Sequence, residues 1–328
     1  MLNNLFPKVR PRRLRKNKTI RNLVSETKLF RSKLIQPLFV SDSNSQKQAI
    51  EAMPGQCIHS RETLFNEIEE LLNLKINTIA LFPNISEKLK DADGTEALNP
   101  ENFMCNLVTQ LKSKFPELVI ITDVALDPYT VTGHDGIIVD GDVDNDATLK
   151  ALEKMSVNLA HAGSDIIAPS DMMDGRIGLI RKSLDKNGYK MTQILSYAIK
   201  YASSFYEPFR NAVGSRGLLK GNKKNYQMDF RNSDEALREV ALDINEGADM
   251  VMVKPGLPYL DIIKLVKEKF KIPVMAYQVS GEYSLLSNAI NKGLIDKQAI
   301  TESLIAFKRS GANAIVSYYA DRLDKILE

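Results

Sequence analysis

The sequence is poor in cysteine, with only Cys57 and Cys105 among 328 residues. Two cysteines without a paired spacing form neither a disulfide framework nor a zinc-finger pattern, and such usage fits a reducing compartment. The sequence has no apolar run close to the roughly 20 residues that a membrane-spanning helix needs. Its N-terminus lacks the apolar core of a secretory signal. We therefore expect a cytoplasmic protein that makes no contact with a membrane.

The net charge is small but unevenly distributed. The chain holds 44 Lys and Arg against 41 Asp and Glu, a net charge of +3. Residues 1–28 contain nine basic residues and one acidic residue, Glu26, so this segment carries +8 and the rest of the chain carries −5. Organelle transit peptides are also Arg-rich and acid-poor. Because Pro7 and Pro11 interrupt any amphipathic helix here, import into an organelle is the minor alternative.

Short apolar strands alternate with longer helical patterns along the remaining chain. We predict eight strands, at Ile35–Val40, Thr78–Phe82, Val119–Leu126, Asp165–Pro169, Gln193–Tyr197, Met250–Lys254, Ile272–Ser280 and Ala314–Tyr319. Helical patterns between them include Arg61–Leu72, Pro100–Phe115, Asp146–His161, Met173–Lys186, Ser233–Glu246 and Leu257–Phe270. Eight such alternations predict one (β/α)8 TIM barrel. A doubly wound sheet is the alternative, but no glycine-rich phosphate loop follows the first strand.

The strand Met250–Lys254 is apolar until its last residue, and Pro255 and Gly256 then stop it. A continuous apolar run suits a parallel strand that is covered on both faces. A lysine at the end of such a strand is poorly solvated, which disfavours the ammonium form and lowers the pKa. The neutral amine is the form that attacks a carbonyl and builds a Schiff base. A lysine that reaches out of the strand end to water is the plain alternative.

Other polar residues follow the ends of the predicted strands, where barrels of this class carry their chemistry. Two lysines, several acids and several hydroxyls are thus expected at one mouth: Asp123, Asp127, Ser170, Asp171, Lys200, Lys254, Gln278, Ser280, Ser317, Tyr318 and Tyr319. The stretch from 214 to 231 is polar, contains three glycines and shows no clear period. Because it follows the fifth strand and helix, we predict that it forms a lid over this mouth.

Several segments also carry a family resemblance: Arg12–Arg15, Gln36–Val40, Met53–Gly55, Ala168–Arg176, Lys200–Tyr206, Met252–Gly256 and Val279–Glu282. On these segments the chain resembles the porphobilinogen synthase (delta-aminolevulinic acid dehydratase) family from about residue 7 to 322. The resemblance implies a lyase (hydro-lyase) that condenses two molecules of 5-aminolevulinate into porphobilinogen and releases two waters. This is an early step of tetrapyrrole and heme biosynthesis, and it needs no organic cofactor.

The resemblance gives the two lysines separate roles. It places the first, propionate-side substrate on Lys200 and the second, acetate-side substrate on Lys254, each held as an imine. Holding both substrates covalently makes a bimolecular condensation intramolecular, which removes several kcal/mol of the barrier. Asp123 is interpreted as a proton-handling or orienting group.

The resemblance also implies which residues bind the two substrate carboxylates. Arg210 and Lys223, with help from Gln227, match positions that bind the acetate-side carboxylate. Ser280 and Tyr318 match positions that bind the propionate-side carboxylate by hydroxyl donation. One departure lies nearby: Glu207 stands where the family usually has glycine. Its closeness to Arg210 is expected to weaken binding of the substrate carboxylate.

The stretch from Asp123 to Gly136 bears on the metal content. Zinc-using members have three cysteines where this chain has Ala125, Asp127 and Asp135. Thiolates select zinc, whereas carboxylates suit magnesium or a monovalent ion. We therefore expect no catalytic zinc, and whether Asp127 and Asp135 hold another ion stays open.

A second set of acids, Glu235, Glu239 and Asp243, recurs every four residues on the predicted helix Ser233–Glu246. The resemblance makes Glu239 the ligand of an allosteric Mg²⁺ at a subunit interface, where the ion keeps several waters. A solvated acidic helix face is the alternative.

The resemblance further divides the chain into an N-terminal oligomerisation arm (1–30) and a catalytic barrel (31–328). It implies a homo-octamer of four arm-exchanged dimers. The basic stretch 1–28 has no aromatic residue beyond Phe6, so no nucleic-acid partner is expected. Two other functions stay open: another class I Schiff-base aldolase, which would leave Lys200 unexplained, and an inactive barrel that binds RNA or a partner through its basic arm.

Overall fold

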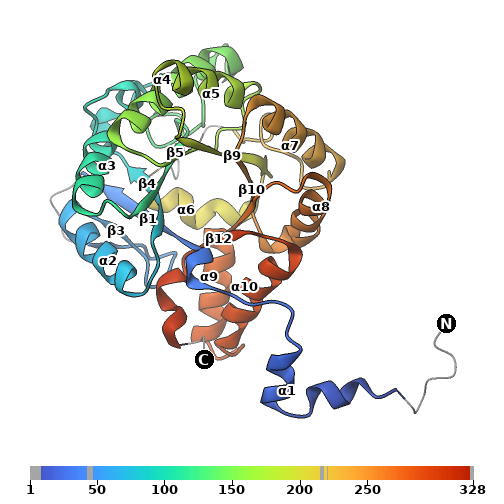
Figure 1. Cartoon of the computed structure of the whole chain (residues 1–328). Helices are drawn as coiled ribbons and strands as arrows, with labels where there is room; N and C mark the ends of the chain where they lie inside the picture. The colour runs from blue at the N-terminus through green and yellow to red at the C-terminus, as the bar shows by residue number, and fades with distance from the viewer. Residues whose placement is uncertain (1–8, 43–46, 215–217, 220, 326–328) are drawn as a thin grey trace.

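The computed structural model describes residues 9–42, 47–214, 218–219 and 221–325. Its centre is a closed ring of parallel strands (Figure 1). The ring consists of β1 (Leu34–Ser41), β4 (Thr78–Asn84), β5 (Val119–Val124), β8 (Ile166–Pro169), β9 (Gln193–Lys200), β10 (Met250–Lys254), β11 (Val274–Gln278) and β12 (Ala314–Ser317). Each strand pairs with the next, and β12 pairs with β1 to close the ring. The predicted (β/α)8 barrel is confirmed.

Helices cover the outside of the ring (Figure 1). They are α2 (Arg61–Asn73), α3 (Phe103–Lys114), α4 (Asn145–Ala162), α5 (Arg176–Lys186), α7 (Asp234–Glu246), α8 (Leu260–Phe270), α9 (Ser280–Asn291) and α10 (Gln298–Ser310). Helix α4 shows how the sequence sets such bounds. The side chain of Asp144 accepts a hydrogen bond from the amide of Ala147, and Gly163 ends the helix at a φ of 106°. An N-cap oxygen and a left-handed C-terminal glycine are favourable helix ends.

Four short strands lie outside the eight-stranded ring in the described part of the chain. The strand β3 (Cys57–His59) pairs with β1 on one side and with β2 (Gln48–Ala49) on the other. A hairpin of β6 (Ile138–Val139) and β7 (Asp142–Val143) lies between β5 and α4 in sequence. Neither addition interrupts the barrel, because the ring pairs β1 directly with β4 and β12.

The N-terminal segment extends away from the barrel (Figure 1). It contains η1 (Pro11–Arg15) and α1 (Lys18–Leu23), and neither element buries a residue. Leu23 has 82% of its surface exposed and Phe30 has 57%. Of the predicted arm over 1–30, residues 1–8 lie outside the described residues. Apolar side chains exposed on an extended segment are typical of a surface that another chain covers.

Several predicted strand boundaries need correction. Strand β9 continues past Tyr197 to Lys200, so Lys200 is the last strand residue and does not lie within the turn that follows. Strand β11 ends at Gln278, and Ser280 begins α9. The predicted lid over 214–231 includes 215–217 and 220, which the structure does not describe. Among the described residues, no helix is long and apolar enough to cross a membrane.

Candidate active site

The two lysines lie side by side at one end of the barrel. Strands β9 and β10 are neighbours, and their register places Lys200 opposite Lys254. Each lysine is the last residue of its strand, and each exposes only 6% of its surface. Because neighbouring strands lie about 4.8 Å apart, both amines enter the same mouth. The pattern of the sequence predicted the end of β10, but only the sheet register shows that these two lysines are partners.

Aromatic rings surround the amine of Lys254. Its Nζ lies 4.8 Å from the ring centre of Tyr277, 5.1 Å from those of Tyr197 and Phe209, and 5.5 Å from that of Tyr206. Burial, followed by the positive charge of Lys200, lowers the pKa of Lys254 to about 7. Much of this amine is therefore neutral at neutral pH, as Schiff-base formation requires.

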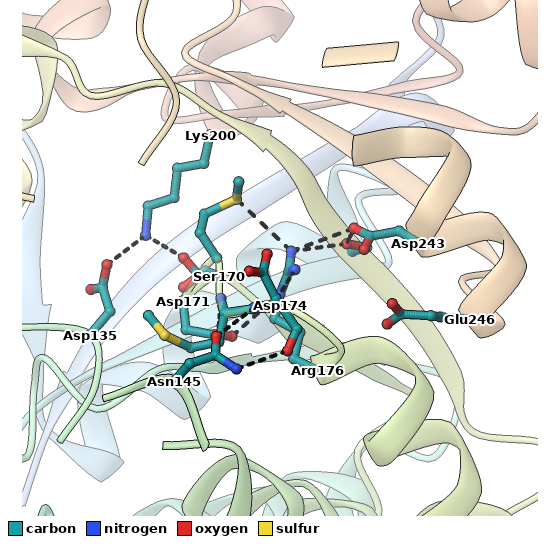
Figure 2. A network of polar contacts seen from close by, with 12 residues as sticks. Asp135, Asn145, Ser170, Asp171, Asp174, Arg176, Lys200, Asp243 and Glu246 are labelled. Carbon is teal, nitrogen blue, oxygen red and sulfur yellow. Dashed lines mark hydrogen bonds and ion pairs between the residues drawn. The ribbon is translucent and has the colours of Figure 1, made fainter. Parts of the chain in front are cut away.

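Polar groups surround the amine of Lys200 (Figure 2). Its Nζ lies 3.3 Å from Asp135 Oδ2 and donates a short hydrogen bond to the carbonyl of Ser170. The other oxygen of Asp135 lies 2.7 Å from the Nζ of Lys223. Burial disfavours ionisation of Asp135, but the two lysines outweigh it and hold the pKa of this carboxyl below its usual range. Asp135 is thus a charged bridge between two ammonium groups.

A buried arginine fixes the loop that carries the Ser170 carbonyl (Figure 2). Arg176 Nη1 donates to the carbonyl of Met173 at 3.0 Å, and its Nε lies 3.6 Å from Asp171. On its other side Arg176 contacts Asp243 of α7 at 3.5 Å. Burial, opposed by Arg176, raises the pKa of Asp171 to about 6. Through these contacts the loop after β8 is tied to α7.

Asp123 lies on β5, and the charges of Lys254 and Lys200 act on its carboxyl group. Its Oδ1 is buried and has no hydrogen-bond partner among the described residues. Burial raises the pKa of Asp123 to about 7, although the charge of Lys254 opposes this shift. A carboxyl group with such a pKa exchanges a proton near neutral pH, which fits the predicted proton-handling role.

The residues predicted to bind carboxylates come together with the lysines. One cavity of about 30 Å³ is lined by Lys200, Lys254, Arg210, Lys223, Gln227, Ser280 and Tyr318, among others. The hydroxyl of Ser280 accepts from the Phe209 amide at 3.0 Å, and the hydroxyl of Tyr318 lies 3.0 Å from that of Tyr277. Two hydroxyls and two cations thus converge from separate segments of the chain.

The sequence did not predict two groups of residues that shape this site: the aromatic rings around Lys254, and Glu282. The four aromatic residues around Lys254 are not evident from the sequence. Their orientation toward the amine depends on how β9, β11, η5 (Ser204–Tyr206) and α6 (Glu207–Ala212) pack together. Glu282 belongs to the family segment Val279–Glu282, but the sequence gives it no role of its own. Its carboxylate accepts hydrogen bonds from the amides of Leu257 at 2.5 Å and Val279 at 2.7 Å. It therefore ties the turn after β10 to the end of β11.

The acidic positions considered for metals fall into two environments. Asp127 and Asp135 face Lys223, at 3.7 and 2.7 Å. Among the described residues, no group of three or more His, Cys, Asp or Glu side chains is arranged to hold a metal ion. Asp243 is buried against Arg176 and Ser196, so the helix face of Glu235, Glu239 and Asp243 is not uniformly solvated.

Glu239 is half-buried and lines a cavity of about 440 Å³ with Asp142, Asn145, Asp174 and Glu235. Burial and then the charge of Asp243 raise the pKa of Glu239. A carboxylate that is costly to ionise beside other acids gains from a cation that neutralises it. A hydrated Mg²⁺, which needs few direct protein ligands, fits such a polar cavity.

A parallel barrel with paired lysines at its C-terminal mouth defines a Schiff-base enzyme of the (β/α)8 class. The model of the family "Delta-aminolevulinic acid dehydratase" matches residues 8–326, and the chain belongs to this family. It is 51% identical over 315 residues, 96% of this chain and 89% of the relative, to a delta-aminolevulinic acid dehydratase of Bradyrhizobium diazoefficiens. It is 47% identical over 319 residues to that of Chlamydia pneumoniae, covering 97% of this chain and 96% of the relative.

A solved structure supports the same family. The delta-aminolevulinic acid dehydratase (porphobilinogen synthase) of Toxoplasma gondii, in complex with the reaction product porphobilinogen, superposes with a TM-score of 0.94. It is 46% identical, and the match covers 97% of this chain and 91% of that chain. Both the barrel and the family resemblance inferred from the sequence are thereby confirmed.

Proposed function

We propose that this chain carries out its family's reaction through Lys254 and Lys200, each of which holds one substrate. The activity is that of a lyase: two molecules of 5-aminolevulinate condense into porphobilinogen, and two waters leave. The observation that carries the assignment of the lysines is the register between β9 and β10, which places Lys200 opposite Lys254. An aldolase with one imine lysine would not need this pair.

Schiff-base formation begins with a neutral amine. The nitrogen of Lys254 adds to the ketone carbon of the second substrate, and the resulting carbinolamine loses water to give an imine. Burial favours the neutral amine of Lys254, because it leaves the ammonium form little solvation. The nitrogen of Lys200 adds to the ketone carbon of the first substrate in the same way, and water leaves there too. Adjacent strands then hold the two substrates together, which favours bond formation between them.

Proton transfer must accompany these steps. A proton leaves the carbon beside one imine before the new C–C bond forms. Asp123 supports this role with a pKa raised to about 7 by burial. Arg210, Lys223 and Gln227 hold the acetate-side carboxylate, and Ser280 and Tyr318 hold the propionate-side carboxylate. Their common lining of one cavity supports both assignments.

Incubation with 5-aminolevulinate, followed by a colour assay for the pyrrole product, tests the activity. Borohydride reduction and mass spectrometry then locate the trapped substrate. We expect label on Lys254 and Lys200 in the active enzyme. Product formation with label on neither lysine would reject their roles, and no product at any substrate concentration would reject the activity itself.

Mg²⁺ bound near Glu239 would favour assembly, without entering the chemistry. The half-buried Glu239 carboxylate and its acidic cavity support the site, and the exposed apolar residues of the arm support an octamer of arm-exchanged dimers. A ligand shifts an assembly equilibrium only through differential affinity. Glu239→Ala should therefore abolish stimulation by Mg²⁺ and the Mg²⁺-dependent shift in sedimentation. An unchanged octamer with full Mg²⁺ response would reject the site.

We propose that the protein is cytoplasmic. Cys57 and Cys105 are both free thiols, which fits the reducing cytoplasm. A relative from Selaginella martensii carries the description "chloroplastic", so import into an organelle is the alternative. Fractionation of the source cells, with detection of the protein in each fraction, separates the two.

A further inference from the structure

The mouth of the barrel holds two cavities that share a wall. The inner cavity contains Lys200 and Lys254, and the outer cavity has a volume of about 600 Å³. Arg210, Lys223 and Gln227 line both of them. A ligand that moves from the outer cavity toward the lysines therefore passes the residues proposed to bind the acetate-side carboxylate.

Glu207 already supplies a carboxylate to this wall. Its Oε1 accepts a hydrogen bond from Nη1 of Arg210 at 2.5 Å, and Glu207 itself lines the outer cavity. The two residues are three positions apart on α6, a spacing that brings side chains together on a helix. Lys223 is paired in the same way with Asp135. Both proposed cations thus contact carboxylates of the chain itself.

These two internal pairs differ in how readily they can be exchanged. The side chain of Asp135 is 1% exposed, whereas that of Glu207 is 58% exposed and that of Arg210 is 21% exposed. An ion pair in contact with water is weak, because solvent screens the attraction and can replace either partner. Glu207 is therefore the carboxylate that an incoming substrate carboxylate can displace.

We propose that Glu207 competes with the acetate-side substrate carboxylate for Arg210 and thereby raises the substrate concentration needed for half-maximal rate. The inference rests on the proposed function, since it concerns the second 5-aminolevulinate. The substrate carboxylate either displaces Glu207 from the guanidinium or shares it beside a like charge. An arginine binds one carboxylate best, through two parallel hydrogen bonds. Once displaced, the exposed Glu207 side chain turns into the outer cavity.

The direct test is Glu207→Gln, which removes the charge and keeps the size of the side chain. KM for 5-aminolevulinate should fall about two- to fivefold, as expected for loss of an exposed ion pair, and kcat should change less. The matched control is Glu268→Gln on α8, where an equally exposed carboxylate pairs with Lys264 at 2.8 Å. This control removes the same charge without touching either cavity and should leave KM unchanged.

A double-mutant cycle with Arg210→Ala isolates the competition. In that background Glu207→Gln should no longer lower KM, because the contested cation is gone. Raised salt should also narrow the difference between wild type and Glu207→Gln, since it screens the exposed pair. A KM that rises or stays constant in Glu207→Gln would overturn the inference while product formation by the wild type upholds the proposed function. A wild type without product would instead overturn the function.

Discussion

The two lysines at the barrel mouth, Lys254 and Lys200, have different surroundings. Around Lys254 the neighbouring groups include the rings of Tyr277, Tyr197 and Phe209. Around Lys200 they are the carboxylate of Asp135 and the carbonyl of Ser170. The same side chain, at the same depth and on adjacent strands, thus sits in an aromatic half and a charged half.

One fold thus places two identical amines in different surroundings. Burial away from water lowers the pKa of Lys254, whereas the Asp135 carboxylate offers Lys200 an ion-pair partner. Lys254 is therefore poised to attack a ketone, whereas Lys200 lies in a polar site beside Asp135 and Ser170. Asp135, bridging Lys200 and Lys223, maintains the charged half.

The largest effect should come from removing the amine of the aromatic half. Lys254→Met should lower turnover more than about 10⁴-fold, because neither the imine nor the intramolecular reaction can form. Lys254→Arg should fail as well, since a guanidinium stays protonated. Product formation and mass spectrometry of borohydride-treated protein measure both variants. Turnover within tenfold of wild type in Lys254→Met would contradict the assignment.

The second largest effect should come from removing the charge of Asp135. Asp135→Asn keeps the shape of the side chain but leaves Lys200 and Lys223 without their shared carboxylate. Turnover should fall about 10²-fold through misplacement of both amines. The unfolding free energy should also fall, by up to about 3–5 kcal/mol, because breaking a buried pair leaves uncompensated charge. Denaturant titration measures this loss, and Asp165→Asn, which alters the part-exposed pair with Lys112, is the control.

The pH dependence of borohydride trapping on Lys254 reports the pKa of this amine. Only neutral Lys254 reacts, so borohydride trapping on it should rise about tenfold per pH unit below its pKa and level off above about 7. Asp123→Asn should move this midpoint to lower pH, since the nearby carboxylate favours the ammonium form. A midpoint near the ordinary lysine value of 10.5 would show that the amine is solvated.

The smallest expected effect concerns metals in the charged half. Positions 125, 127 and 135 carry no thiolate, so a chelator selective for zinc should change activity by less than about twofold. The assay runs with constant Mg²⁺, and elemental analysis of the active enzyme accompanies it. Stoichiometric zinc whose removal abolishes activity would show that the carboxylates of this half hold the metal.

The fold was largely predictable from the chain. Strand Met250–Lys254 was predicted with both ends correct, because a buried parallel strand is a continuous apolar run and Pro255 stops it. Strand β9 was predicted too short, ending at Tyr197. Its extension to Lys200 depends on pairing with β10, which places Lys200 opposite Lys254. Pairing between strands far apart in sequence leaves no local signal.

The linear chain already shows the number of strand and helix alternations, the lysine that ends β10, and the family motifs. These features are local, since they depend on side-chain period and on residues close together in the chain. Folding, by contrast, sets the surroundings of the two amines. The rings around Lys254 come from β9, β11 and the segment around α6, and Asp135 reaches Lys200 across 65 positions of sequence. A pKa reflects everything within a few ångströms, and only folding brings those groups together.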